Sequence, residues 1–450
     1  MNTADREALA RKVLELALGA GASAVEVIIR EGSDFSASVR LQKLENLQQA
    51  NYRRLGLRVF DGKRAAVSAT SDFSTSSAGK LVSDALEMAR AAGEDPWAGL
   101  PPPESYAPKI PDVQVCFPAA SELPVEDKIG LASRCERAAF EADPRITNSE
   151  GAEFSDKLVH TLYCNSLGIC SAYSKTTVSL SVTPLAESDG FKQRDYWLTT
   201  RLDLSRMEPP EQVGIEAARR TLRRLGARKI KTCEVPIVLE PLAAAAVLKH
   251  ISEAVSGTAI VRKASFLMGK LGARVASRLV TIRDDALLDG GPGSRPFDAE
   301  GIPSQSTVIV REGVLESYLL DSYSGRKLGF RSTGNSSREP NGSPSVGPAN
   351  FFLEGGSISP GEIIASVKRG LVVTELIGFG ADIVSGNYSQ GASGIWIENG
   401  QPAFPVEEVT IAGNLMDMML GIEAVGDDLL ALGEVFAPTV LIGKMIVSGS

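Results

Sequence analysis

Ser324 and Lys327 have the spacing of a serine nucleophile and its lysine base. In Ser-x-x-Lys hydrolases the lysine can deprotonate the serine, which then attacks the substrate. Ser385-Gly386-Asn387 resembles the Ser-x-Asn element of those enzymes, but the third element, Lys-Thr-Gly, is absent from the sequence. The same spacing recurs at Ser77 and Lys80, so the pattern has little specificity. A stand-alone hydrolase that uses Ser324 and Lys327 is therefore an alternative interpretation and not the leading one.

Metal-binding side chains are scarce in this sequence. A zinc site needs about three or four His, Cys or carboxylate ligands that converge on one point, and the chain has only two histidines, His160 and His250. Cys164 could face Cys170 across a turn, but His160 lies four residues before Cys164, roughly 13 Å along a strand. We therefore interpret these residues as core side chains and expect no cofactor in this chain. The five cysteines are scattered without a Cys-x-x-Cys, which is typical of reduced cytosolic cysteines.

A basic cluster around residue 225 could contact an acidic partner or nucleic acid. Some of its arginines are four residues apart and share a helix face. We interpret the cluster as a solvated helix end, because cations also suit a helix C-terminus. The net charge of −8 does not favour binding to phosphate, so we expect no nucleic-acid partner. The members are Arg219, Arg220, Arg223, Arg224, Arg228, Lys229 and Lys231.

The N-terminal residues give no sign of a targeting segment. Met1 to Glu7 mix acidic and basic residues and lead into an amphipathic segment. They lack the basic and apolar regions of a signal peptide. The sequence also has no apolar stretch of about 18 residues, the length of a membrane span. These features predict a cytoplasmic protein without membrane association.

The periodic segments predict an α+β fold, with an N-terminal α/β region followed by a β-rich C-terminal domain. We divide the chain into an N-terminal α/β domain (1–95), a Pro-rich linker (96–122), a middle α/β segment packed with the first domain (123–230) and a β-rich C-terminal domain (231–450). The linker follows from seven prolines between residues 94 and 122, which deny hydrogen bonds to helices and ladders.

Apolar spacing predicts the individual elements within these regions. The predicted helices are residues 4–18, 78–92, 125–142, 211–225 and 241–255. A strand is predicted at 25–29, with 35–41 returning beside it. The predicted hairpins are 54–60 with 63–69 around Asp61-Gly62, 157–164 with 169–182, and 307–310 with 314–320. Residues 331–350 form a loop too long to be a simple connection.

Three stretches carry a recognisable family pattern. They are Gly56 to Gly62 (GLRVFDG), Ser332 to Asn335 (STGN) and Gly386 to Gly394 (GNYSQGASG), and the last continues to Val409–Leu415 (VTIAGNL). Together, and in this order, they resemble the TldD/PmbA family, once named modulators of DNA gyrase. The third stretch with its continuation resembles the PmbA/TldE branch in particular.

The resemblance implies a cytoplasmic two-subunit peptidase that degrades or trims unstructured peptides. The TldD branch carries His-Glu-x-x-x-His on a helix and a late cysteine, which bind the metal. In this chain the matching positions are Leu248, Lys249 and Glu253, with His250 between them, and no cysteine follows Asp427. We therefore expect a metal-free partner of a TldD-like metallopeptidase subunit, with zinc in that partner. Alone, the chain is expected to be non-catalytic and able to form a homodimer.

The glycine- and serine-rich stretches allow two interpretations of equal weight. Backbone without Cβ bulk can lie close to another chain, so these stretches could contact the partner subunit or an extended peptide added as a strand. They could equally be tight turns at strand ends. The remaining alternative is a regulatory protein associated with DNA gyrase, as the old family name suggests. The candidate contact residues are Thr333, Gly334, Asn335, Asn387, Ser389, Gly391 and Ser393.

Overall fold

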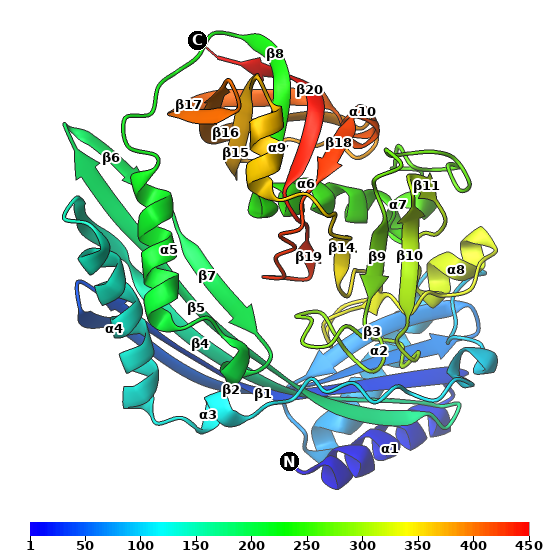
Figure 1. The fold of residues 1–450 in the computed structure, drawn as a ribbon. Coiled ribbons are helices and arrows are strands. Elements are labelled where there is room, and N and C mark those ends of the chain that lie inside the picture. The colour runs from blue at the N-terminus through cyan, green and yellow to red at the C-terminus, as the bar shows by residue number, and fades with distance from the viewer. Residues whose placement is uncertain (450) are drawn as a thin grey trace.

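The computed structural model describes residues 1–449, and its largest element is a seven-stranded antiparallel sheet. The strand order is β3-β2-β1-β4-β5-β6, with β7 beside β5. Figure 1 shows this sheet as a curved layer beneath the C-terminal half of the chain. Its strands are β1 (Ala24–Arg40), β2 (Lys43–Asp61), β3 (Arg64–Thr70), β4 (Ile146–Asn165), β5 (Cys170–Ser188), β6 (Phe191–Arg194) and β7 (Trp197–Arg201).

Helices cover one face of this sheet, which we call the outer face. Because side chains alternate along a strand, the odd-numbered residues of β1 point to it: Val27 is buried under one pair of helices and Val39 under the other. The even-numbered residues line the inner face, which is turned toward the C-terminal half (Figure 1). The two pairs of helices are α1 (Thr3–Gly19) with α2 (Thr75–Ala91), and α4 (Val125–Ala142) with α5 (Pro210–Leu222).

The Pro-rich segment between α2 and α4 is fixed to the C-terminal half. It contains a 3-10 turn, η1 (Pro103–Tyr106), and a short helix, α3 (Ala119–Glu122). The Tyr106 hydroxyl donates to the Glu300 carbonyl at 3.2 Å. The Arg326 guanidinium donates to three carbonyls in the segment, those of residues 97, 99 and 100, each at 3.0 Å.

The C-terminal half is built on a six-stranded sheet ordered β17-β16-β15-β8-β20-β18, in which β17 also pairs with β20. Helix α6 (Pro241–Ala254) covers the face that carries the main core, and α9 (Pro360–Ser366) covers the opposite face. The strands are β8 (Cys233–Leu239), β15 (Arg369–Ile377), β16 (Asn387–Glu398), β17 (Gln401–Asn414), β18 (Ile422–Val425) and β20 (Val440–Ser448).

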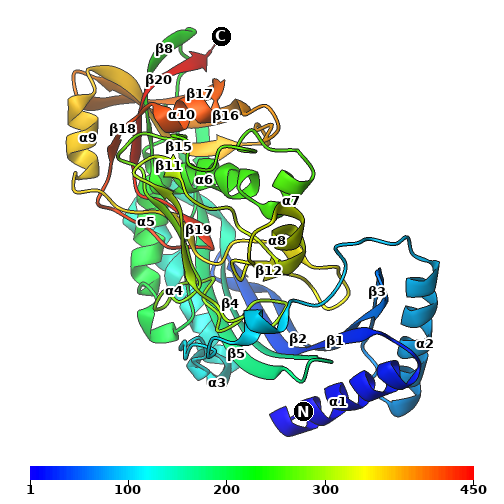
Figure 2. The same cartoon turned by 90° about the vertical axis from the view of Figure 1, so that its right-hand side faces the viewer.

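A smaller five-stranded sheet, ordered β11-β10-β9-β14-β19, lies between the six-stranded sheet and the inner face (Figures 1 and 2). Its strands are β9 (Ile282–Asp285), β10 (Ser306–Arg311), β11 (Val314–Leu315), β14 (Phe351–Leu353) and β19 (Val435–Phe436). The remaining elements are α7 (Gly257–Val261), α8 (Ser322–Leu328), the paired β12 (Ser336–Ser337) and β13 (Ser345–Val346), and α10 (Leu415–Leu420).

A buried polar cluster joins the inner face to the C-terminal half. Glu26 on β1 is fully buried, and its carboxylate lies 2.7 Å from Arg338 and 3.3 Å from Arg58. The Tyr163 hydroxyl donates to the same carboxylate at 2.8 Å. Although burial raises the pKa of Glu26, the two arginines and the tyrosine lower it by more, so the net shift is downward.

A second buried carboxyl, Glu300, lies next to this cluster. Burial and, secondarily, the nearby carboxylates of Asp298 and Asp321 together raise its pKa to about 8. Both the backbone N–H and the hydroxyl of Ser322 donate to Glu300. The loop that carries Glu300 is therefore held by polar contacts inside the protein and not by solvent.

The basic cluster near residue 225 is a second junction between the two halves. Arg223 lies 2.6 Å from Glu240, and Arg224 lies 2.6 Å from Glu375 on β15. Arg220 is 4% exposed and also pairs with Glu240. The interpretation of this cluster as a solvated helix end is therefore wrong for Arg220, Arg223 and Arg224, because carboxylates of the C-terminal half lie against them. The other members are exposed, as that interpretation expected: Arg219, Arg228, Lys229 and Lys231.

The predicted α+β fold is confirmed, and several helices match closely, with α4 covering the predicted 125–142. The predicted return strand at 35–41 is wrong, because those residues continue β1 and β2 is the returning strand. Gly32 does not break β1: a Cβ there would lie 2.5 Å from the Leu158 carbonyl oxygen, so the strand needs a glycine. The hairpin turn consists of Gly62-Lys63 and not Asp61-Gly62.

The cysteines also differ from the interpretation above. Cys164 and Cys170 face each other at the ends of β4 and β5, as their spacing allowed, but a disulfide joins them. Cys116, Cys135 and Cys233 are free. The description of all five as reduced is therefore wrong for one pair. Within residues 1–449, no helix is long and apolar enough to cross a membrane.

Candidate functional site

Helix α6 carries the three positions that match the family metal motif. The helix begins after Glu240, with Pro241 in its first turn, where the missing N–H costs nothing. Leu248 is 4% exposed and packs into the main core. Lys249 and Glu253 are exposed on the other side of the helix. Of the three, only Glu253 has a side chain that can bind a metal ion in this environment.

His250 is the other potential ligand on α6. Its Nδ1 lies 3.8 Å from Glu253 Oε2, and its ring meets the Tyr388 ring edge-on with 6.3 Å between centroids. In the described part of the chain, no group of three or more His, Cys, Asp or Glu side chains is arranged to hold a metal ion. Zinc in proteins takes at least three protein ligands. The residues present on α6 therefore do not fit a zinc site.

A groove of about 310 Å³ opens at the C-terminal end of α6. Its walls are the helix end at Ser252 and Glu253, the segment 345–348 and Ile383. Segment 345–348 belongs to the same long loop, residues 331–350, as the first candidate block, and Ile383 lies four residues before Asn387. The groove thus brings together the motif helix and the surroundings of both glycine-rich blocks.

The turn Thr333-Gly334-Asn335 supports the groove from behind. The Thr333 hydroxyl donates to Asn335 Oδ1 at 2.6 Å, and Asn335 Nδ2 donates to Asp284 Oδ2 at 2.6 Å. The Gly347 N–H donates to the Asn335 carbonyl at 3.0 Å. Asn335 is 1% exposed. These bonds tie the groove wall at 345–348 to β9, and in the isolated chain the Asn335 side chain is used entirely inside the protein.

Asn387, Ser389, Gly391 and Ser393 share one face of β16, opposite the face that packs on α6. Asn387 and Ser389 are exposed, whereas Ser393 is 3% exposed. β16 is an interior strand whose backbone pairs with both β15 and β17. A peptide therefore cannot be added as a strand to β16 itself, and a contact there would have to use side chains of the first half of the block.

Ser324 and Lys327 do not form a nucleophile and base. Ser324 is 2% exposed, and it completes a capping box at the start of α8 by bonding to Asp321. The Lys327 ammonium is exposed and donates to the Tyr323 hydroxyl at 3.2 Å. The serine thus has a local structural reason to be present, since a capping box satisfies backbone N–H groups at a helix start.

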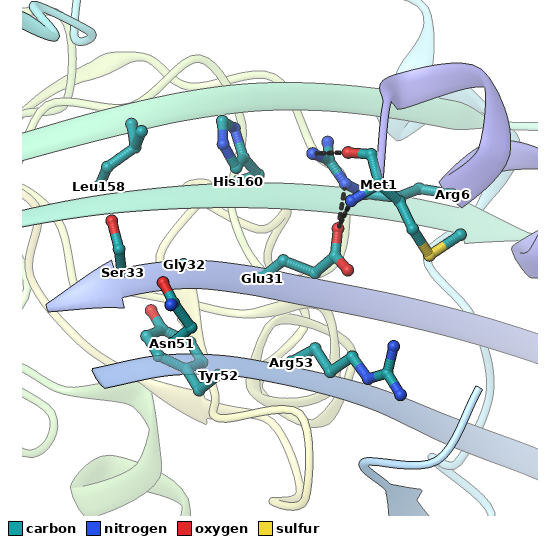
Figure 3. A pocket seen from close by; sticks show the side chains of 10 residues that line it. All are labelled: Met1, Arg6, Glu31, Gly32, Ser33, Asn51, Tyr52, Arg53, Leu158 and His160. Atoms are coloured by element: carbon teal, nitrogen blue, oxygen red, sulfur yellow. Dashed lines mark hydrogen bonds and ion pairs between the residues drawn. The ribbon is translucent and has the colours of Figure 1, made fainter. Parts of the chain in front are cut away.

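The outer face of the large sheet has a pocket of about 440 Å³ that includes His160 (Figure 3). His160 Nδ1 lies 2.6 Å from the Ser174 hydroxyl, and burial lowers the pKa of His160. Glu31, directly opposite His160 in the β1–β4 register, binds Arg6 at 2.6 Å. A Ser-His pair needs a third group that orients the imidazole, and here the nearest carboxylate is committed to an arginine.

The inner face of the same sheet has another pocket, of about 460 Å³, which sequence reasoning missed. Arg30 and Arg54 lie directly opposite each other in the β1–β2 register, and both line it. Their charges were visible in the sequence. Their proximity was not, because 35–41, and not β2, was taken as the strand that pairs with the segment before Arg30.

The scaffold and the motif helix are those of a metallopeptidase family. Family models match three consecutive regions, described as PmbA/TldA metallopeptidase domain 1 (residues 25–89), central domain (118–225) and C-terminal domain (232–449). The chain is 36% identical to Metalloprotease PmbA of Escherichia coli O157:H7 over 436 residues, covering 97% of this chain and 94% of the relative. A Metalloprotease PmbA homolog of Haemophilus influenzae is also 36% identical, over 97% of this chain and 94% of its own length. The chain therefore belongs to the PmbA/TldD family, as its motifs predicted.

Solved structures share the whole fold. A proposed modulator of DNA gyrase from Bacteroides thetaiotaomicron superposes with a TM-score of 0.92 at 26% identity, over 100% of both chains. TldE from Thermococcus kodakarensis has the same fold, with a TM-score of 0.88 at 21% identity, over 99% of this chain and 100% of that one.

Proposed function

We propose that this chain is the metal-free partner subunit of a TldD-like metallopeptidase, and that it completes a chamber for unstructured peptides. The observation that carries this proposal is α6. The family scaffold extends over nearly the whole chain, yet the motif helix has Leu248 in the core and offers only His250 and Glu253 as ligands. A scaffold that is retained without the ligands is best explained by a role in shape and assembly.

The zinc and the hydrolytic chemistry then belong to the TldD-like subunit. Zinc there would polarise a bound water molecule for attack on the peptide bond. The groove at the end of α6 is the surface of this chain that we assign to the chamber, because it lies where the family places its motif helix. Asn387 and Ser389 are the exposed block residues nearest to it along the chain, and we assign them to contact with the peptide or the other subunit.

The same proposal covers location and assembly. We place the complex in the cytoplasm, where unfolded peptides need to be cleared, and we expect no nucleic-acid or membrane partner. A permanent pair of subunits would bury on the order of 2,000 Å² or more. Without its partner, the chain would use the same surface to form a homodimer.

Mixing the purified subunits tests the proposal directly. This chain, the TldD-like subunit from the same organism and their mixture are each assayed on casein. We expect cleavage by the mixture, loss of cleavage with a chelator, and weak or no cleavage by each subunit alone. Elemental analysis after dialysis should find zinc in the TldD-like subunit and less than stoichiometric zinc in this chain.

Three results would contradict the proposal. The first is chelator-insensitive cleavage by this chain alone, and the second is full activity of the sister subunit without it. The third is one zinc per chain that is lost in His250→Ala, which would make this chain a metalloprotease in its own right, as the names of its relatives suggest. Lys249→Ala, on the same helix, leaves His250 and Glu253 in place and adds no ligand atom, so it is the matched control.

A further inference from the structure

The inner-face pocket lies between the two junctions that hold the halves together. Its floor is made by β1, β2, β4 and β5, and Pro340 from the long loop forms a wall. That wall is in close contact with the sheet, because a Cβ on Gly56 would overlap the Pro340 carbonyl. The volume of about 460 Å³ falls within the range of sites that bind small ligands or a few side chains.

Two arginines with no acid between them meet in this pocket. Arg30 and Arg54 are directly opposed across the β1–β2 pair, and like charges in that position destabilise a sheet. Arg30 has a partial counterion in Glu339, at 3.1 Å, whose side chain is 75% exposed. The Arg54 side chain is exposed and forms no ion pair or hydrogen bond with any residue from 1 to 449. The fold thus keeps an unfavourable pair of cations at an accessible place.

The other charged residues extend the same imbalance. The Lys175 ammonium donates to the Pro292 carbonyl at 2.6 Å, and burial lowers its pKa to about 8. Lys157 lies 3.4 Å from Asp34, which is its only acidic neighbour in the pocket wall. The pocket lining holds the cations of Arg30, Arg54, Lys157 and Lys175 against the carboxylates of Asp34 and Glu339, whereas the Arg53 side chain points to the outer face, where it donates to the Ser71 carbonyl.

We propose that this pocket binds carboxylates of an acidic, extended peptide, with Arg54 and Arg30 as the principal contacts. A carboxylate between the two guanidinium groups would replace their repulsion with charge-assisted hydrogen bonds, which an arginine makes in a planar, two-pronged geometry. The two surplus positive charges of the lining are opposite in sign to the net charge of −8 of the chain, so they are a local feature.

A peptide suits this pocket better than a nucleic acid. A polyphosphate chain needs a continuous basic track, but here Asp34 and Glu339 interrupt the basic lining. The overall negative charge would also repel a long polyanion, whereas single carboxylates on a peptide can enter one at a time. The inference rests on the proposed function only in calling this peptide a substrate. Binding itself requires neither the partner subunit nor cleavage.

Fluorescence anisotropy with the purified full chain tests the inference. The probes are a fluorescein-labelled Gly-Ser peptide that carries several glutamates and the same peptide with glutamines in their place. We expect the glutamate peptide to bind at least tenfold more tightly at low salt. Arg54→Gln should weaken its binding by about tenfold, the effect of one lost hydrogen bond to a charged group. The glutamine peptide should show no change with this variant.

Arg137→Gln is the matched control, since it removes the same charge from exposed α4 on the outer face and should leave binding unchanged. The thermal midpoint of ligand-free Arg54→Gln separates binding from structure: it should be equal to or above that of the wild type, because a like-charge pair is removed. Any one of four results would overturn the inference. The first two are equal binding of the two peptides and an equal effect of Arg54→Gln and Arg137→Gln on binding. The others are a thermal midpoint several degrees lower in Arg54→Gln and tighter binding of oligothymidylate than of the glutamate peptide. These outcomes are read without peptidase activity, so they are distinct from failure of the proposed complex.

Discussion

Replacing Glu26 with glutamine should uncouple the two halves of the protein. The substitution keeps the size of the side chain but removes the negative charge that faces Arg338 and Arg58, at 2.7 and 3.3 Å. Arg338 has 2% of its side chain exposed and cannot turn to solvent. Its Nε and Nη2 atoms already have no hydrogen-bond partner within the described residues. Glu26→Gln therefore leaves a buried, uncompensated guanidinium.

The expected cost follows from this burial. Removal of one partner from a buried ion pair destabilises a protein by about 3–5 kcal/mol. For a folding unit of about 200 residues, each kcal/mol lowers the midpoint by about 2–4 °C, so the thermal midpoint should fall by about 6–20 °C. Because Glu26 belongs to the large sheet and Arg338 to the C-terminal half, a single transition in the wild type should separate into two.

Differential scanning calorimetry measures both the midpoint and the separation. The effect should also depend on pH in a defined direction. The folded pKa of Glu26 is lowered, so the contribution of its charge is present above the unfolded value of about 4.3 and is lost as pH falls below it. The difference between wild type and variant should therefore be largest near neutral pH and shrink in acid.

Two further variants sharpen this measurement. Glu7→Gln breaks an exposed pair with Arg11 and should cost at most about 0.5 kcal/mol. The double variant Glu26→Leu/Arg338→Leu should be more stable than Glu26→Gln, because the buried guanidinium of Arg338 is removed together with its partner and only the partly exposed Arg58 loses a counterion. If Glu26→Gln shifts the midpoint no more than Glu7→Gln does, the buried cluster does not hold the halves together and the reasoning fails.

Four other substitutions give three separate tests. Glu300→Gln should flatten the pH dependence of stability. Because the folded pKa of this carboxyl is raised to about 8, the wild type should lose up to about 1.4 kcal/mol of unfolding free energy per pH unit as pH rises from about 5 toward 8. Urea titrations that give both proteins the same change of unfolding free energy with pH would contradict this. Gly394→Ala should impair folding, since its Cβ would overlap the Val372 carbonyl, whereas the Cβ of Gly391→Ala would lie 3.3 Å from its nearest atom and this variant should fold. Circular dichroism that shows a folded Gly394→Ala and an unfolded Gly391→Ala would exclude this explanation. Ser324→Ala should lower stability by about 1 kcal/mol through the lost capping bond. Casein cleavage by the mixed subunits should stay within twofold of the wild-type rate. A loss of roughly 10³-fold in that rate would restore the nucleophile interpretation.

Local features of the fold could be predicted from the sequence. The helix at 125–142 was found because its apolar spacing and its ends depend only on neighbouring residues. The turn of the β2–β3 hairpin was placed within one residue because glycine accepts its positive φ of 61°. The error at residues 35–41 arose because the course of that strand depends on residues that are distant in the sequence. β1 continues past residue 29 through Gly32, and the close approach of Leu158 from a distant strand, which explains the glycine there, cannot be read from neighbouring residues.

The candidate site also has parts that could be predicted from the sequence and parts that could not. The mismatch at Leu248, Lys249 and Glu253 could be predicted because a family motif is a contiguous pattern. The groove beside that helix could not, since it depends on segments more than 90 residues apart in the sequence. The opposed arginines of the inner face depend on strand register, which a shift of one residue would invert. The partners of the basic cluster near residue 225 were equally hidden, because Glu375 lies about 150 residues from Arg224.

The arrangement of charge on the inner face has a consistent physical explanation. At one end, Glu26 with Arg338 fixes the C-terminal half to the sheet, and at the other end Arg223 and Arg224 fix it through Glu240 and Glu375. At both ends the buried cations are matched with carboxylates, as burial requires. Between them the lining keeps a surplus of positive charge in an open pocket. If the two halves only had to be held together, pairing these charges with carboxylates too would make the protein more stable. The unmatched middle is understandable if two rigid junctions hold a gap open for a ligand that brings the missing negative charge.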